Sequence, residues 1–454
     1  MPNHFITGML AISINYLFFA FEMERLMQYI WQHRLWMPAQ MATVDGRRIQ
    51  VLDPGRLNTD AGPDFFNAKI MIGEQKWAGD VEIHVRASDW HRHHHDGDPA
   101  YESVILHVVR HDDMAIRRAD GQIIPQLRME CASDFHTSYS SLLNAAAAPT
   151  LPCAQEIRRL ERVHLRGWLD RLAFERLHAK ADRVHDILHR TNGDWESACF
   201  ITLARALGFG VNSDPFERLA ASIPLAAAGK HSDSMLSIQA LLFGQAGLLP
   251  SDTGNDRYVE LLQREYSFLS HKFGLTPPAS LGWKMARMRP ANFPHRRIAF
   301  LAAMLFGGFK LMSAITEAKN AEEILALFNA PLTGYWETHY HFGKESPDLP
   351  TLLSISSRRI LAINVAAPIL YAWGTSHNLP QCHDAAITLL QELPPESNSV
   401  VNIFASAGVK CPDAFTSQAL IQLRREYCET RKCLYCRIGH RMLARKAFSA
   451  NAEC

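Results

Sequence analysis

The acidic residues Asp64 and Glu82 have side chains and a spacing that could perform chemistry. Asp64 follows a Gly-Pro turn and precedes the strand-like run 65–72, and Glu82 lies in a second strand-like run at 81–85. The two runs predict a hairpin. Carboxylates on neighbouring strands can hold Mg²⁺ or Mn²⁺ through oxygen atoms, and such a metal can activate water for attack on a phosphodiester. We therefore expect Asp64 and Glu82 to be metal ligands; the alternative is a structural hairpin whose charged side chains are solvated.

The second strand carries its polar side chains on one face. Side chains two residues apart in a strand point the same way, and here polar and apolar residues alternate: Asp80, Glu82, His84 and Arg86 against Val81, Ile83 and Val85. The polar face predicts a site, and the apolar face predicts a core. His84 is therefore the third candidate catalytic residue.

This arrangement resembles the short motif of the PD-(D/E)xK nuclease superfamily. Pro63-Asp64 would be its first part and Glu82-Ile83-His84 its second, with 17 residues between the two acids. The resemblance implies a core of a helix, a three-stranded meander, a helix and a further strand. It also implies that Asp64, Glu82 and the Ile83 carbonyl hold the metal, and that Glu24 matches an acid that some members place on the first helix.

His84 departs from that motif, which has a lysine two residues after the glutamate. Lysine is charged at ordinary pH, whereas histidine is charged only when protonated. A neutral His84 could instead be a general base or a metal ligand. Lys69 or Lys76 could supply the missing positive charge from another position in the sheet.

Histidines are dense in this region, since seven of the chain's 22 lie within residues 84–111. Imidazole ligands favour zinc, so one alternative is a zinc-dependent small-molecule hydrolase that uses His84, His93, His95 and His107. The simpler interpretation of the segment HRHHHDGD is a solvated polar loop. In the apolar run VILHVV, the simpler interpretation of His107 is a core histidine.

A group of cysteines near the C-terminus predicts a second metal site. Cys428, Cys433 and Cys436 have the spacing C-x4-C-x2-C, with Cys411 before them and His440 after them. Three close thiols indicate metal binding, and Cys411 or His440 could be the fourth ligand. Zn²⁺ is the expected metal. The spacing also fits the first three ligands of a plant-type [2Fe–2S] cluster, and thiols without a metal remain an alternative.

Charge alone does not direct this protein to nucleic acid, because its formal net charge is only +1. Any basic surface must be local, and basic residues gather in the segment 284–297 and around the terminal cysteines. Such clusters can neutralise phosphates, although solvated helix faces are the alternative. The residues expected to contact nucleic acid are Arg287, Arg289, Arg296, Arg297, Arg424 and Arg425.

Composition bounds the class of protein and its compartment. A chain of 454 residues with 47% hydrophobic content can bury large cores. Nine cysteines, an odd number, do not match a secreted disulfide framework and favour the cytoplasm. Residues 5–21 are uncharged and near the lower length for a membrane span, but no basic residue precedes them and no cleavage site follows. We expect Met23 to be the true start and 1–22 to be an upstream extension; a signal, an anchor or a buried helix is the alternative.

The order of patterns predicts the domains. Strand patterns after an initial helix predict an α/β or α+β domain at 23–140, for which the resemblance to the nuclease superfamily implies a mixed sheet. A small-residue stretch with prolines predicts a linker at 141–152. Helical periodicity then predicts an all-helical domain at 153–400, with a single helical run at 154–189 and another at 195–207, followed by a basic cysteine-containing region at 401–454.

Long strings resemble an uncharacterised bacterial family, a domain of unknown function. They are DPGRLNTDAGPDFFNAKI, GDVEIHVRASDW and VILHVV, with further similarity through LLFGQAGLL, RPANFPHRRIA and the terminal cysteine region. That resemblance implies no activity. With the nuclease motif, the expected function is hydrolysis of DNA or RNA by a metal-dependent enzyme. A catalytically degenerate nucleic-acid-binding or scaffold protein is an alternative, beside the zinc hydrolase.

Overall fold

The computed structural model describes residues 22–36, 41–118, 120–129, 139, 151–252 and 256–443. The expected extension except for Glu22, and nearly all of the expected linker, lie outside these residues. The chain forms two compact units, one of residues 1–160 together with 425–454, and one of residues 161–424. This division groups 401–424 with the helical residues and 425–454 with the first unit.

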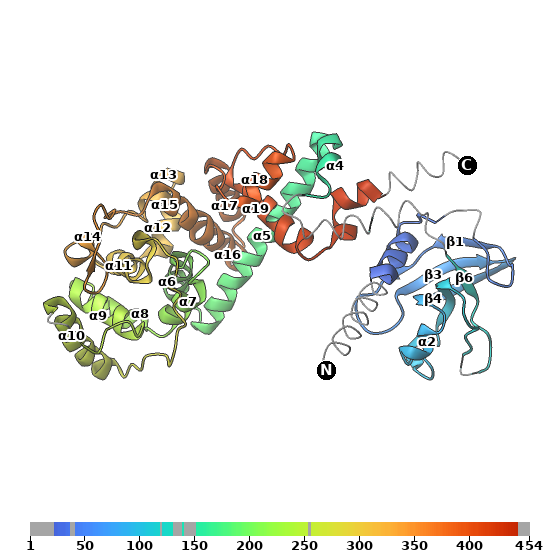
Figure 1. The fold of residues 1–454 in the computed structure, drawn as a ribbon, viewed down its shortest axis with the longest axis horizontal. Helices are drawn as coiled ribbons and strands as arrows, with labels where there is room; N and C mark the ends of the chain where they lie inside the picture. The colour runs from blue at the N-terminus through green and yellow to red at the C-terminus, as the bar shows by residue number, and fades with distance from the viewer. Residues whose placement is uncertain are drawn as a thin grey trace, which may run out of the picture. The chain divides into compact units, whose positions relative to one another are not determined.

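The first unit is built on a mixed sheet with the strand order β1-β3-β4-β5-β6, in which β2 pairs with β3 (Figure 1). The strands β1, β3 and β4 are antiparallel neighbours, and β4-β5 and β5-β6 are parallel pairs. The strands are β1 (Ile49–Asp53), β2 (Arg56–Leu57), β3 (Phe65–Ile72), β4 (Gln75–Arg86), β5 (Val104–His111) and β6 (Gln126–Arg128).

The hairpin expected from the sequence is present as β3 and β4. A two-residue turn, Gly73-Glu74, joins them, and Gly73 has a φ of 62°, which glycine adopts without strain. The parallel partner β5 requires a crossover connection. Here it contains the short helix α2 (Asp89–Arg92) and the turn η2 (Pro99–Tyr101).

One face of this sheet is covered by a helix at residues 22–32 and by the C-terminal segment. The apolar side chains of β3 and β4, such as Ile70 and Ile83, share a core with Leu26 of that helix and with Leu434 and Leu443. The polar residues of β4 therefore lie on the other face, as their alternation predicted. Short elements of this unit outside the sheet are α4 (Ala154–Arg159) and η6 (Cys433–Tyr435).

The second unit is largely helical, as expected (Figure 1). Its longest helix, α5 (Arg162–Arg190), packs against α16 and α19. The others are α6 (Trp195–Leu207), α7 (Ser213–Ala221), α8 (Leu225–Gly229), α9 (Met235–Gln245), α10 (Arg257–Phe273), α11 (Pro294–Leu305), α12 (Leu311–Glu317), α13 (Ala321–Ala326), α14 (Tyr335–Thr338), α15 (Ile355–Leu361), α16 (Ala367–His377), α17 (Pro380–Glu392), α18 (Ser399–Ser406) and α19 (Ala414–Gln422).

Short irregular elements complete the helical part. They are the turn η3 (Pro290–Asn292), the small hairpin β7 (His339–His341) with β8 (Lys344–Glu345), and the π-helical turns η4 (Ala362–Ala366) and η5 (Leu423–Cys428). Among the helices of the described residues, none combines the length and the apolar character that a membrane crossing requires. The uncharged run 5–21 lies outside those residues.

Candidate metal centre

Asp64 and Glu82 are brought together at the start of β3. The backbone N–H of Asp64 donates to Glu82 Oε2 at 3.0 Å, and the backbone N–H of Ile83 donates to Asp64 Oδ2 at 3.0 Å. A β-bulge between Phe65 and Ala68 lies beside this pair, and Asn67 has a φ of 59° within it. Bulges redirect side chains next to functional sites, and this one follows Asp64 directly.

Glu82 and His84 point toward the same place from one strand. Glu82 Oε1 lies 3.4 Å from His84 Nε2 and also 3.4 Å from His95 Nε2. Both strand residues are buried, with Glu82 5% exposed and His84 1% exposed. The expected convergence of Glu82 and His84 is therefore present, because residues two apart in a strand share a face.

The histidine-rich loop turns back onto this pair. His93 Nδ1 lies 3.1 Å from His84 Nε2, and His84, His93 and His95 each offer a ring nitrogen within 4.8 Å of the others. Helix α2 sets this geometry: its Asp89 accepts from the backbone N–H of Arg86, and the N–H of His95 donates to Trp90 O. His93 and His95 thus approach His84, whereas most of the segment is exposed, as the simpler interpretation of a solvated loop expects.

His107 lies behind His84 on the neighbouring parallel strand. Its Nε2 is 2.9 Å from His84 Nδ1, and it is fully buried. The pairing of β4 with β5 sets Glu82 opposite His107. Since the second ring nitrogen of a metal-binding histidine usually makes an orienting hydrogen bond, His107 is placed to orient His84.

The helix at residues 22–32 adds two polar residues. Gln28 donates to Asp64 Oδ1 at 2.8 Å, so both carboxylate oxygens of Asp64 accept hydrogen bonds. Glu24 is half-buried and close enough to Asp64 and Glu82 for their charges to affect it. The resemblance to the nuclease superfamily implied an acid at this position.

Three carboxyl groups of the site have raised pKa values. Burial raises the pKa of Glu82 to about 8, and burial with the nearby charge of Glu82 raises the pKa of Asp64 to about 8. Burial, then Asp64 and Glu82, raise the pKa of Glu24 to about 8. Buried carboxyl groups that lie close together resist being ionised at the same time. A divalent cation would offset the repulsion between their negative charges.

The histidines have lowered pKa values for the complementary reason. Burial holds the pKa of His84 well below its usual range, with His107 and His93 as further causes. Burial also lowers the pKa values of His93 and His95. A neutral imidazole offers a lone pair to a metal. His84 therefore does not supply the permanent positive charge that lysine would.

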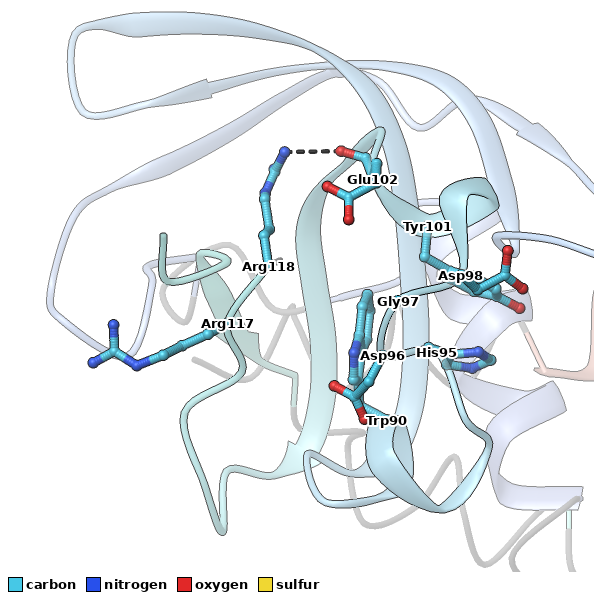
Figure 2. A pocket seen from close by; sticks show the side chains of 9 residues that line it. All are labelled: Trp90, His95, Asp96, Gly97, Asp98, Tyr101, Glu102, Arg117 and Arg118. Carbon is cyan, nitrogen blue, oxygen red and sulfur yellow. Dashed lines mark hydrogen bonds between the residues drawn. The ribbon is translucent and has the colours of Figure 1, made fainter. Parts of the chain in front are cut away.

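Solvent reaches this region through a cavity of about 120 Å³ beside His95. Tyr101 stacks on His95 with ring centroids 3.8 Å apart, and Trp90 forms another wall. In Figure 2 the Arg118 guanidinium extends to the Glu102 carbonyl, a hydrogen bond of 2.9 Å, while the Arg117 side chain points away. The cavity thus lies beside the histidine cluster, on the side of His95.

The donor set of the cluster is three imidazoles with a carboxylate beside them. Ring nitrogens of His84, His93 and His95 form the group that could hold an ion, and neither Asp64 nor Glu82 belongs to that group. Glu82 Oε1 lies beside it, 3.4 Å from a ring nitrogen of His84 and of His95. Hard ions such as Mg²⁺ prefer oxygen ligands, whereas Mn²⁺ and Zn²⁺ also accept imidazole. The residues present therefore suit a transition-metal ion, with Asp64 beside it.

A family model described as "Protein of unknown function (DUF2851)" matches residues 24–399. The chain belongs to this family. The match confirms the resemblance to a domain of unknown function and assigns no activity. No curated protein and no solved structure shows significant similarity to the chain.

Lys69 and Lys76, the lysines expected to supply the missing charge, are set apart from Glu82 by the strand register. Both lie within the DUF2851 region, on the strands β3 and β4. The strand register sets Lys69 opposite Ala78, four residues along β4 from Glu82, which corresponds to about 13 Å. Lys76 lies six residues from Glu82 along the same strand, about 20 Å away. Neither lysine lies opposite Glu82 in the sheet, and the expectation that one of them serves the site stays a prediction.

Another cation lies close to the centre. Arg92, at the end of α2, affects the pKa values of both Glu24 and His84. Its guanidinium pairs with Asp89 at 2.8 Å, and half of the side chain is exposed. The sequence contained no motif that would identify Arg92, because its position depends on the crossover loop.

The basic residues expected to bind nucleic acid have different environments. Arg296 is fully buried and donates to the carbonyls of Trp336, His339 and Pro350, at 2.6 to 3.1 Å. Arg297 is 8% exposed, donates to Asn292 and lies 4.3 Å from the ring centroid of Phe209. The prediction is wrong for both, because their guanidinium groups stabilise the helical unit. Arg287, Arg289 and Arg425 are exposed, and Arg424 is half-buried.

The cysteines predicted as ligands fall in two units. Cys428, Cys433 and Cys436 belong to the first unit, and Cys411 belongs to the second. The Cys411 thiol donates to Asp413 O at 3.7 Å. The three C-terminal cysteines also lie beyond the matched DUF2851 residues 24–399.

Proposed function

We propose that the first unit is a metal-dependent hydrolase of DNA or RNA phosphodiesters. The observation that carries this proposal is the position of Glu82 Oε1, which lies 3.4 Å from two imidazole nitrogens, while Oε2 of the same carboxylate accepts from the backbone N–H of Asp64. Asp64, Glu82 and His84 are the candidate catalytic residues.

The order of elements supports the same class of enzyme. A helix at 22–32 precedes the antiparallel strands β1, β3 and β4, and a crossover through α2 leads to the parallel strand β5. This is the order that the resemblance to the PD-(D/E)xK superfamily implies. The two acids lie at the start of the second strand of the meander and within the third.

Of the two ions expected at this pair, the donor set favours Mn²⁺ over Mg²⁺ because imidazoles take part. Glu82, His84, His93 and His95 would hold the ion. When bound, it would polarise the phosphate and lower the pKa of water. Gln28 orients Asp64, and His107 orients His84. The exposed residues Arg287, Arg289 and Arg425, with the half-buried Arg424, remain the proposed contacts to nucleic acid.

A zinc-dependent hydrolase of small molecules is the second candidate. The approach of His84, His93 and His95 within 4.8 Å favours it, because three imidazoles form a common catalytic zinc site. A catalytically inactive nucleic-acid-binding protein is the third candidate, and the same experiment separates all of them.

The experiment measures cleavage of labelled DNA and RNA by the full chain with Mg²⁺, Mn²⁺ or Zn²⁺. We expect cleavage with Mn²⁺ and a loss of at least about a hundredfold in Asp64→Asn and Glu82→Gln, since each change weakens a metal ligand or its neighbour. Glu74→Gln, in the exposed turn of the same hairpin, is the matched control.

Three outcomes contradict the nuclease proposal. Equal cleavage by the parent and by both variants would assign the activity to a contaminant. Tight zinc binding without cleavage at any metal would favour the small-molecule hydrolase. Binding of nucleic acid without cleavage, unchanged by Glu82→Gln, would favour the inactive binding protein.

A further inference from the structure

Four cysteines line one small cavity in the first unit. The cavity has a volume of about 20 Å³, and its walls are Pro152, Cys153, Tyr427, Cys428, Cys433, Cys436 and Gly439. Cys153 comes from the chain before α4, whereas the other three come from the C-terminal segment. The two segments are far apart in sequence and belong to the same compact unit.

The local backbone explains how the three C-terminal cysteines share a wall. Cys428 ends the π-helical turn η5, and Cys433 begins the turn η6, with Arg431 between them at a φ of 57°. Gly439 lets the following helix approach this turn, because a Cβ atom there would lie 2.1 Å from Cys433 O. The chain thus folds back so that Cys428, Cys433 and Cys436 line one cavity. Among the described residues only His84, His93 and His95 already have ligand atoms within 4.8 Å of one another, so the thiols must turn inward to hold one ion.

Core packing fixes the other wall. Cys153 and Cys433 both pack against the sheet core that contains Leu434 and Leu443, and Cys436 is 7% exposed. Thiol groups that gather in a small cavity are typical ligands of zinc or of an iron–sulfur cluster.

We propose that Cys153, Cys428, Cys433 and Cys436 are the four ligands of one thiolate-bound metal centre. Cys153 completes the C-x4-C-x2-C group. The two residues that the sequence suggested as the fourth ligand are engaged elsewhere: the Cys411 thiol donates to Asp413 O in the other unit, and His440 Nδ1 hydrogen-bonds with the Tyr29 hydroxyl.

The size of the cavity favours a single ion. A sphere the size of one water molecule needs roughly 10–15 Å³ by the same kind of measure, so about 20 Å³ accommodates one Zn²⁺. An iron–sulfur cluster would require the walls to move apart. In either form the centre would tie residue 153 to the C-terminal segment and would contribute directly to folding.

This centre shares no residue with the cluster at Glu82, and its test has its own readout. The full chain is purified anaerobically, and zinc, iron and inorganic sulfide are measured together with visible absorbance. Replacement of the native metal with Co²⁺ then reports thiolate ligands through sulfur-to-cobalt charge-transfer absorption, which imidazole and carboxylate ligands do not produce.

We expect the cobalt charge-transfer band in the parent chain and in Cys411→Ser, and its loss or marked weakening in Cys153→Ser. Cys382→Ser, in the helical unit, is the matched control. Zinc without sulfide identifies a single ion, and iron with sulfide identifies a cluster on the same ligands. A band retained in Cys153→Ser, a band lost in Cys411→Ser, or a parent chain without bound metal would overturn the proposal.

A measurement on the unaltered chain covers the case in which Cys153→Ser does not fold. Alkylation followed by mass spectrometry compares the cysteines before and after a chelator. We expect Cys153 and Cys433 to react at least about tenfold more slowly while the metal is bound, since a coordinated thiolate is a poor nucleophile. Cys382 should react at the same rate in both states. Equal rates for Cys153 with and without chelator would exclude it as a ligand.

Discussion

At the scale of single residues, His84 shows how surroundings set chemistry. It occupies the position at which the nuclease motif has a lysine, and burial together with His107 keeps its pKa well below the usual range. A neutral ring at this place can bind a metal or accept a proton, but it cannot stabilise a developing negative charge as a lysine does. Arg92 is the nearby residue with a permanent charge.

The contact between His84 and His107 predicts a measurable effect on metal affinity. His107→Phe keeps a ring but removes the hydrogen bond to His84 Nδ1, and loss of such an orienting partner typically costs about 10- to 100-fold in metal affinity. Titration calorimetry with Mn²⁺ measures the change. His107→Gln, whose amide can replace the ring Nε2, should recover part of the affinity.

His111→Phe is the control, since His111 is exposed at the end of the same strand. A purely structural role for His107 would lower the melting temperature of His107→Phe without changing the affinity of the folded protein. That result would contradict the orienting role.

The sequence predicted some site residues and not others, for physical reasons. The period of two in a strand was enough to place Glu82 and His84 on one face, and the hairpin brought Asp64 to them. His93 and His95 could not be assigned in the same way, because loops have no fixed period and α2 decides their direction. Arg296 was assigned to a basic surface from composition, which does not report burial.

At the scale of elements, the strand pair β4-β5 positions the histidines. Gly79 allows β5 to approach, because a Cβ atom there would lie 2.5 Å from Ile105 Cγ2 and 2.6 Å from Ser103 O. The carbonyl belongs to the backbone and cannot move away easily. The parallel pairing that sets Glu82 opposite His107 therefore depends on a residue without a side chain at position 79.

Gly79→Ala should consequently destabilise the first unit. Overpacking of this kind costs about 1–3 kcal/mol, and differential scanning calorimetry would measure it as a lower melting temperature. Gly167→Ala is the control, since nothing lies within 4 Å of a Cβ atom at that helical position. We expect this control to be neutral or stabilising because alanine favours helix. An unchanged melting temperature in Gly79→Ala would show that β5 can shift without cost.

Elements with strong periodicity were predicted closely. The strand Phe65–Ile72 and the helix Trp195–Leu207 begin and end where the sequence pattern placed them. The single helical run expected from Ala154 to His189 is instead two helices, α4 and α5, with an extended backbone at Leu160 and Glu161 between them. Apolar spacing continues through this break, so the pattern alone could not reveal it.

At the scale of the whole molecule, the helical unit contains a buried group that is sensitive to pH. His295 in α11 is 1% exposed, and its Nδ1 has no hydrogen-bond partner among the described residues. Burial, with a smaller effect of His341, lowers the pKa of His295 to about 3. The ring therefore stays neutral in the folded unit.

Acid should weaken the helical unit through this residue. The unfolded chain binds the proton with the ordinary histidine pKa of about 6.5. The contribution of neutral His295 to the free energy of unfolding is therefore fully present above that pH and is lost as the pH falls toward 3. The loss approaches about 1.4 kcal/mol per pH unit in this window. Chemical unfolding between pH 7 and pH 4 measures it, and His295→Phe should reduce the slope. An identical slope in the variant would exclude His295 as its source.

Because Leu434 and Leu443 lie in the same core as the strands near the beginning of the chain, that core lacks part of its packing until the ribosome has translated the intervening 161–424 segment. During synthesis the helical unit can fold as soon as it emerges, whereas the nascent sheet must wait with apolar surface uncovered. Chaperone dependence in the cell should therefore concentrate on the segment that is made first.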